Sequence, residues 1–246
     1  MFPIRNTVPT RFPPTLTWLL IAANSAVFLY QLSLTPTQQE WFLTTFALIP
    51  ARFFPPYVTG HHAPGLFAYV SFFTNMFLHG GWLHLILNMW TLWLFGPPIE
   101  DRLGSGRYVI FYLVCGLLAS ISHAVFNADS AVPALGASGA IAGVLGCYVR
   151  LLPYSRIIVL VPILFLPLFF EVYAIVFVGL WFAIQVFEGA AQLLTSPTGG
   201  GIAWWAHIGG FSAGLAFGTF LALSKRRYRS YHADEGIYGF TPFGHR

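Results

Sequence analysis

The sequence predicts an all-α membrane protein, built as a bundle of six transmembrane helices with both termini in the cytoplasm. Three observations lead to this prediction. Apolar residues make up 57% of the 246 residues and charged residues only 8%, about a third of the charged share in an average soluble protein. Six apolar runs come near the length of a membrane span. Basic residues gather on one side of these runs, as in cytoplasmic loops.

The apolar runs set the positions of the predicted helices. A transmembrane helix needs about 20 predominantly apolar residues. The runs cover residues 16–32, 83–95, 108–126, 138–152, 172–193 and 204–223. The first run could be a secretory signal peptide, but it is long for one and no small-x-small cleavage site follows it. The second is short and extends upstream through residues 79–82.

Two further stretches are apolar but are not predicted as spans. Residues 157–170 contain Pro162 and Pro167, and proline interrupts a helix because it lacks the backbone N–H. We therefore expect this stretch to be interfacial or partly re-entrant. Residues 35–70 are rich in aromatic residues and proline, and we expect a long extracytoplasmic loop that rests partly in the membrane interface.

The basic residues set the predicted orientation. Of the 12 lysine and arginine residues, all except Arg52 fall on one side of the six spans, and cytoplasmic loops are rich in these residues. This placement explains the isoelectric point of about 9.2 without a nucleic-acid partner. The expected organisation is a cytoplasmic tail over 1–15, a membrane domain over 16–223 and a basic cytoplasmic tail over 224–246.

Three polar clusters lie inside the predicted spans, where polar side chains are costly and often functional. The first contains His84 and Asn88, which are four residues apart and therefore share one face of a helix. Both can donate hydrogen bonds, so they could hold a negatively charged oxygen that develops during a reaction. The alternative is that they bond only to neighbouring helices.

The second cluster surrounds Ser138 at the start of the fourth span. Serine is a common helix N-cap, which is one explanation for it. Small residues on both sides, Gly136 and Gly139 among them, would instead leave the hydroxyl accessible to a substrate backbone. We expect these two glycines to belong to the oxyanion and substrate-binding site. The free N–H groups at a helix N-terminus would also favour a negatively charged oxygen.

The third cluster places His207 before glycines at every fourth position, Gly210, Gly214 and Gly218. Such a face lets another helix pack closely, and the fourth span carries a similar face of small residues. If the two faces pack together, His207 meets Ser138 at a similar depth and could act as its general base. Because all three clusters lie toward the outer end of their spans, we predict a catalytic site there.

With these motifs the sequence resembles the rhomboid family of intramembrane serine proteases. The resemblance covers most of the chain and rests on H-x-x-x-x-H-x-x-x-N, G-x-S-G and A-H-x-x-G, in the second, fourth and sixth spans. It implies a rhomboid-like bundle in which Ser138 is the nucleophile and His207 the base. His84, Asn88 and the Ser138 backbone N–H would hold the oxyanion, and His79 would support the outer loop. No cofactor or metal is expected.

The resemblance also implies partners and a location. The expected partners are transmembrane protein substrates and the lipid bilayer, and the expected location is a bacterial inner or plasma membrane, as a multi-pass protein. The sequence departs from the family at Ala142, where many members carry an aromatic residue packed on the catalytic histidine. Phe211 or Trp205 could take its place. Trp41 and Arg52, which form a pair in the first loop of many members, are apart here.

Three other functions stay open at this point. A rhomboid-like pseudoprotease would bind transmembrane segments without cleaving them, and Ala142 slightly favours it. A haem or metal protein that uses His79, His84 and His207 would leave the Ser138 motif unexplained. A channel or transporter is less favoured, because neither a broken-helix pair nor an internal repeat is visible in the sequence.

Overall fold

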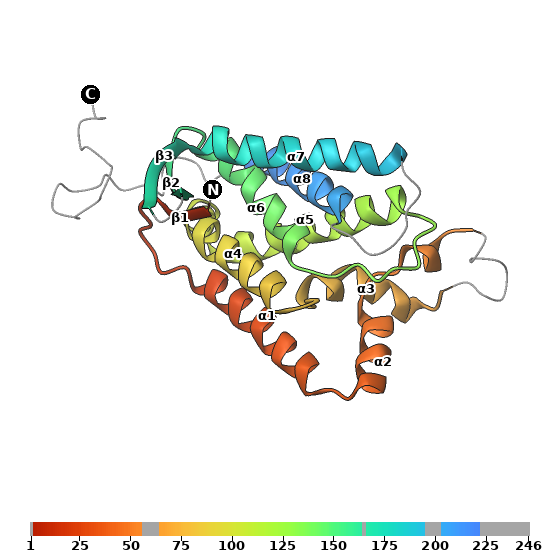
Figure 1. Ribbon diagram of the computed structural model, residues 1–246. Coiled ribbons are helices and arrows are strands. Elements are labelled where there is room, and N and C mark those ends of the chain that lie inside the picture. The colour runs from red at the N-terminus through yellow and green to blue at the C-terminus, as the bar shows by residue number, and fades with distance from the viewer. Residues whose placement is uncertain (1, 56–63, 164–165, 195–202, 222–246) are drawn as a thin grey trace, which may run out of the picture.

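The computed structural model describes residues 2–55, 64–163, 166–194 and 203–221. Within them the chain forms a bundle of long helices, with a small sheet at one end and short helices at the other (Figure 1). The predicted tail over 224–246 lies outside the described residues, as do the last two residues of the predicted membrane domain.

Within the described part of the chain, long helices occupy the six runs predicted as spans. They are α1 Thr15–Ser33, α4 Trp82–Leu103, α5 Ser105–Phe126, α6 Ser138–Leu151, α7 Ala174–Leu194 and α8 Trp204–Leu221. By length and composition, three of them can cross a membrane, over Thr15–Ser33, Ser105–Phe126 and Ala174–Gln192. Helix α6 is a shorter apolar helix. The chain is therefore a mostly helical, multi-pass membrane protein, as predicted.

Helix α4 is longer than the sequence predicted, because it continues through Pro97 and Pro98 to Leu103. Proline cannot donate the helical hydrogen bond to the carbonyl four residues before it. The carbonyl of Leu94, which Pro98 cannot serve, accepts a hydrogen bond from Asn6 Nδ2 at 2.5 Å. A side chain from the N-terminal segment therefore replaces a bond that the proline removes, and the helix is not broken there.

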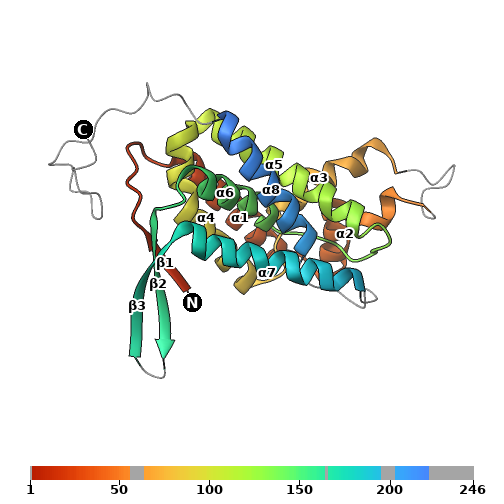
Figure 2. The same cartoon turned by 90° about the horizontal axis from the view of Figure 1, so that it is seen from above.

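A three-stranded antiparallel sheet projects from one end of the bundle, beside the start of α7 (Figure 2). Its strands are β1 Phe2–Asn6, β2 Arg156–Ile163 and β3 Leu166–Tyr173, in that spatial order. This corrects the purely helical prediction, because the stretch 157–170, expected to be interfacial or re-entrant, lies in a β-hairpin. Pro162 pairs with Pro167 near the hairpin tip, where two missing N–H groups are tolerated. Strand β1 lies in the segment predicted as a tail.

Short helices occupy the described parts of the predicted first loop, 35–70, and the residues just after it. They are α2 Pro36–Phe46, α3 Ser71–Thr74 and the 3₁₀ helices Pro50–Phe53, Leu66–Val70 and Asn75–Phe77. Helix α2 begins with a capping box, in which Thr35 and Gln38 satisfy each other's backbone N–H groups. Aromatic rings join the later pieces, for example Phe53 and Phe72 with centroids 4.9 Å apart. These elements lie at the end of the bundle opposite the sheet (Figure 1).

Helix α6 runs through the centre of the bundle, and residues 139–148 are buried. Its glycine face packs directly on α8. A methyl group at Gly210 would overlap the carbonyl oxygen of Gly139, and one at Gly214 would overlap that of Gly143. Two backbones approach this closely only where neither helix carries a side chain. This contact fixes the depth of α6 and α8 relative to each other.

Candidate active site

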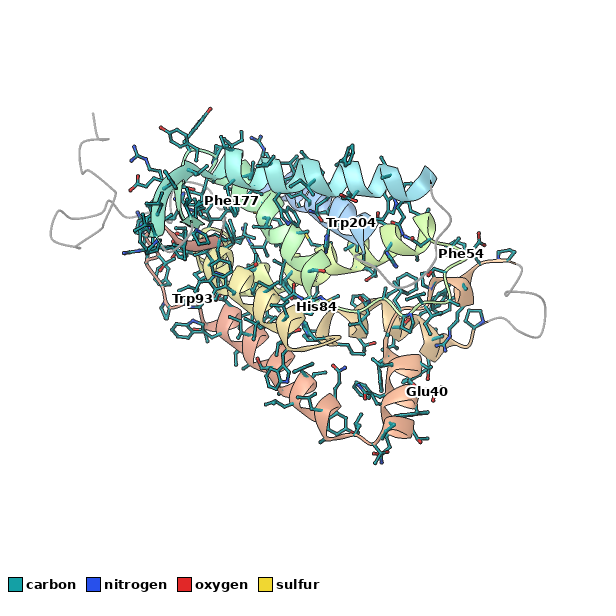
Figure 3. All side chains as sticks on the ribbon, in the orientation of Figure 1. Glu40, Phe54, His84, Trp93, Phe177 and Trp204 are labelled. Carbon is teal, nitrogen blue, oxygen red and sulfur yellow. The ribbon has the colours of Figure 1, made fainter. Side chains whose placement is uncertain are left out.

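Ser138 and His207 meet at the starts of α6 and α8. The distance between Ser138 Oγ and His207 Nε2 is 2.8 Å, a good hydrogen bond. In Figure 3, Trp204 marks the first residue of α8, and His207 follows one turn later. His207 is buried, whereas Ser138 is half-buried. A buried imidazole therefore faces a hydroxyl that can still be reached.

The Ser138 side chain does not cap its own helix. Ala137 occupies the N-cap position of α6, and no side chain makes a capping hydrogen bond there. The Ser138 hydroxyl is therefore available to His207, and its backbone N–H lies in the first turn, where helix N–H groups have no partner within the helix. The glycine contact between α6 and α8 that the sequence predicted is present, and it brings the two side chains to the same depth.

The far side of the His207 ring is held by helix α7. Its Nδ1 lies 2.7 Å from Gln185 Oε1, and the ring centroid of Trp181 lies 5.7 Å from that of His207. Sequence reasoning missed both residues. The available signal was that Gln185 is a polar residue in an apolar helix, but its partner on another helix could not be read from the sequence.

Two donors face the segment just before Ser138. Gly136 has a φ of +129°, and a methyl group there would lie 2.7 Å from His84 Cε1 and 3.8 Å from Asn88 Nδ2. Only glycine fits both this backbone conformation and this space. His84 Nδ1 accepts a long bond, 3.5 Å, from the Gly80 N–H, an arrangement that allows Nε2 to carry the hydrogen and donate. Among the described residues, Asn88 Nδ2 is buried without a hydrogen-bond partner.

A small pocket adjoins Ser138 between α5, α6 and the loop before α6. Its polar lining comes from Asn75, Ser120 and His123, and the rest is mainly small residues such as Gly116 and Ala140. Asn75 Nδ2 donates to Ser120 Oγ at 2.9 Å. The reachable hydroxyl therefore stands beside a cavity that admits only a small group.

Comparisons with known proteins show the family of this chain. A family model described as the rhomboid domain matches residues 67–224. The chain belongs to the rhomboid family. It is 30% identical over 234 residues to rhomboid protein 1, mitochondrial, of Saccharomyces cerevisiae, which covers 90% of this chain and 58% of the yeast protein. It is 34% identical over 145 residues to the rhomboid protease GluP of Bacillus subtilis, which covers 59% of this chain and 25% of that protein.

A third relative is the presenilin-associated rhomboid-like protein, mitochondrial, of Mus musculus, 28% identical over 154 residues. The match covers 59% of this rhomboid and 36% of the mouse protein. The chain thus spans at most 58% of the length of these three relatives. Two of the three are named as mitochondrial, so they give no support to the bacterial location expected from the sequence.

This rhomboid has Ala142 where many members carry an aromatic residue, and the ring contact to His207 comes from a different helix. The aromatic neighbour of His207 is Trp181 of α7, with the edge of Trp204 at a centroid distance of 6.4 Å. Phe211 stacks on Phe182 at 4.0 Å, and Trp205 on Phe126 at 3.8 Å. The two expected substitutes are therefore engaged elsewhere, and α7 supplies the ring contact.

In this rhomboid, His79 and Gly139 both lie against other parts of the protein. The backbone N–H of His79 donates to Gln31 Oε1 at 3.1 Å, and Gln31 Nε2 donates back to its carbonyl. Its ring lies 5.2 Å from that of His84, so it can support the oxyanion side of the site. A methyl group at Gly139 would collide with Ala119 of α5. Its predicted contact with substrate stays a prediction.

The remaining sequence-based expectations concern the first loop and metals. Arg52 donates to the carbonyl of Thr44, while Trp41 lies with its ring edge-on to Phe46. Among the described residues, histidine, cysteine and acidic side chains form no group of three that could hold a metal ion.

Proposed function

We propose that this rhomboid is an intramembrane serine endopeptidase that hydrolyses peptide bonds in or near transmembrane segments of other membrane proteins. The observation that carries the proposal is the 2.8 Å contact between Ser138 Oγ and His207 Nε2, near the Asn88 amide, whose Nδ2 has no hydrogen-bond partner among the described residues. An isolated serine hydroxyl is a weak nucleophile at neutral pH, and a histidine within hydrogen-bonding distance activates it as a general base.

The reaction follows the geometry of the dyad. His207 Nε2 accepts the proton of Ser138 as Oγ attacks the peptide carbonyl carbon. The resulting oxyanion is stabilised by the Ser138 backbone N–H, His84 and Asn88. His207 then gives the proton to the leaving amine, and the C–N bond breaks. A water molecule, deprotonated by His207, attacks the acyl-enzyme ester and releases the carboxyl product and free Ser138.

The proposed arrangement in the membrane follows from the helix order. Six helices cross the bilayer, both termini are cytoplasmic, and the dyad opens toward the outer side. The short helices between α1 and α4 lie at that outer end (Figure 1). Substrates enter from the side, near α7. Their helices must unwind locally to present a peptide bond, and the pocket of small residues favours small side chains beside it.

A rhomboid-like pseudoprotease that binds transmembrane segments is the second candidate. Ala142 is the feature that favours it, because the usual aromatic contact to the histidine is missing from α6. Trp181 of α7 provides a ring contact to His207 instead, which weakens this argument. The two candidates differ in one observable, which is cleavage.

The test is cleavage of a synthetic transmembrane peptide, with small residues near its outer end, by protein in liposomes. Ser138→Ala and His207→Ala should each reduce cleavage below detection while the far-ultraviolet circular dichroism stays unchanged. Ser212→Ala, at an exposed position of α8, is the matched control and should cleave normally. Cleavage retained by either dyad variant contradicts the mechanism. Binding of the peptide without cleavage by the wild type supports the pseudoprotease.

A further inference from the structure

Gln185 connects helix α7 to the dyad through a buried chain of hydrogen bonds. The side chain is 4% exposed. Its Nε2 donates to the carbonyl of Trp181 at 3.0 Å, and its Oε1 lies 2.7 Å from His207 Nδ1. A polar side chain inside an apolar helix is costly unless it is hydrogen-bonded. These two contacts therefore offset the cost of burying Gln185.

The chain of bonds has a fixed direction. The carbonyl of Trp181 can only accept, so the amide end facing it must be the NH₂ group. The other end, facing His207, is therefore the carbonyl oxygen, which also can only accept. His207 Nδ1 must then carry the hydrogen, which leaves the lone pair of Nε2 toward the Ser138 hydroxyl. This is the one neutral form of the ring that can remove the serine proton.

We propose that Gln185 is a positioning residue that holds His207 in this tautomer and orientation. The inference rests on the proposed serine protease function and adds a neutral third member to the dyad. The nearby Trp181 restrains the ring by contact, but an aromatic face cannot select which nitrogen is protonated. Gln185 makes that selection, because its carbonyl oxygen requires a hydrogen on His207 Nδ1. Acting through His207, it would change the rate of the chemical step more than substrate binding.

The test measures the rate at which a fluorophosphonate probe labels Ser138 in detergent, from about pH 5 to about pH 9. Gln185→Met keeps the side-chain volume and removes both hydrogen bonds. Labelling should slow about 10- to 100-fold, a part of what a general base contributes. Val186→Met, an exposed neighbour on α7, is the matched control and should label at the wild-type rate.

A second variant separates positioning from folding. Gln185→Glu, when ionised, loses the bond to the Trp181 carbonyl but keeps an acceptor facing Nδ1. Labelling at alkaline pH should therefore be largely retained. The acid limb of the profile should move to higher pH, because a carboxylate stabilises protonated His207. The other titratable side chains whose charge acts on His207 are His84 and His123, and both stay unchanged in this variant.

The outcomes distinguish this inference from the proposed function. If wild-type Ser138 is not labelled, the proposed function fails and the inference fails with it. If the wild type is labelled, but Gln185→Met labels at the wild-type rate per folded molecule, only the inference is overturned. An unchanged pH profile in Gln185→Glu would overturn it too, because a carboxylate in contact with His207 Nδ1 has to move the acid limb.

Discussion

Two buried polar clusters of the bundle differ in how their hydrogen bonds are satisfied. Near the sheet, Glu100 accepts bonds from the backbone N–H groups of Leu16 and Thr17, from the Thr17 hydroxyl and from Ser105, at 2.8 to 3.0 Å. The carboxylate thus stabilises the first turn of α1, where helix N–H groups need acceptors and favour negative charge. This cluster ties α1, α4 and α5 together.

At the opposite end of α4, by contrast, a buried polar group has no hydrogen-bond partner among the described residues. This group is the side-chain amide nitrogen of Asn88, Nδ2. Leaving a buried donor unpaired costs about 1–3 kcal/mol. One helix therefore carries an acidic side chain whose oxygens are satisfied and an amide whose donor is not. The difference suggests that the first stabilises the fold and the second serves a reacting group.

The largest effect is expected at the satisfied cluster. Glu100→Ala removes a charged acceptor from two backbone N–H groups at about 1–3 kcal/mol each, so the free energy of unfolding should fall by about 2–6 kcal/mol. Thermal unfolding in detergent measures this change. Glu40→Gln, on the exposed face of α2, is the control and should leave the midpoint unchanged. A Glu100→Ala protein as stable as the wild type would contradict a stabilising role for the Glu100 cluster.

A smaller effect of a different kind is expected at Asn88. Asn88→Ala should lower kcat about 10²- to 10³-fold, equal to about 2.7–4 kcal/mol of transition-state stabilisation. The unfolding midpoint should hardly change, because no hydrogen bond within the described structure is lost. Peptide cleavage and thermal unfolding are measured on the same preparation. Leu87→Ala, an exposed position of the same turn, serves as control. A large drop in stability with normal kcat would assign Asn88 to the fold.

The smallest effect is expected at Gly214, which affects both the packing of the bundle and the position of His207. Gly214→Ala pushes α8 away from the carbonyl of Gly143 and should cost about 1–3 kcal/mol of stability, as overpacking does. It should also slow cleavage, because His207 moves with α8. Gly179→Ala, where an added methyl group meets nothing within 4 Å, is the matched control on α7. Slower unfolding or faster cleavage in Gly214→Ala would contradict the close contact.

The sequence predicted the helices better than it predicted their ends and the sheet. Long apolar runs specify helices whose backbone bonds are local, which is why the six runs coincide with helices. Proline was taken as a helix breaker in the stretch 157–170, where the structure has a hairpin and Pro162 faces Pro167. The second run was given as 83–95, but α4 continues past Pro97 and Pro98, where Asn6 serves the freed carbonyl of Leu94. Both outcomes depend on contacts between distant segments.

The site was predictable to the extent that its members carry local motifs. Ser138, His84 and Asn88 stand in motifs with regular spacing, and the glycine faces indicated which helices meet. Gln185 and Trp181 carry no such motif. Their roles depend on the rotation of α7 about its axis, and a helix with apolar residues on all sides does not specify that rotation.

The most direct test of the dyad is to map the covalent adduct of a fluorophosphonate probe by mass spectrometry. We expect one His207-dependent adduct in the wild type, on Ser138. We expect none on Ser138 in His207→Ala, and none at position 138 in Ser138→Ala, with both variants folded. An adduct on a different serine, or equal labelling of Ser138 without His207, would contradict the assignment of nucleophile and base.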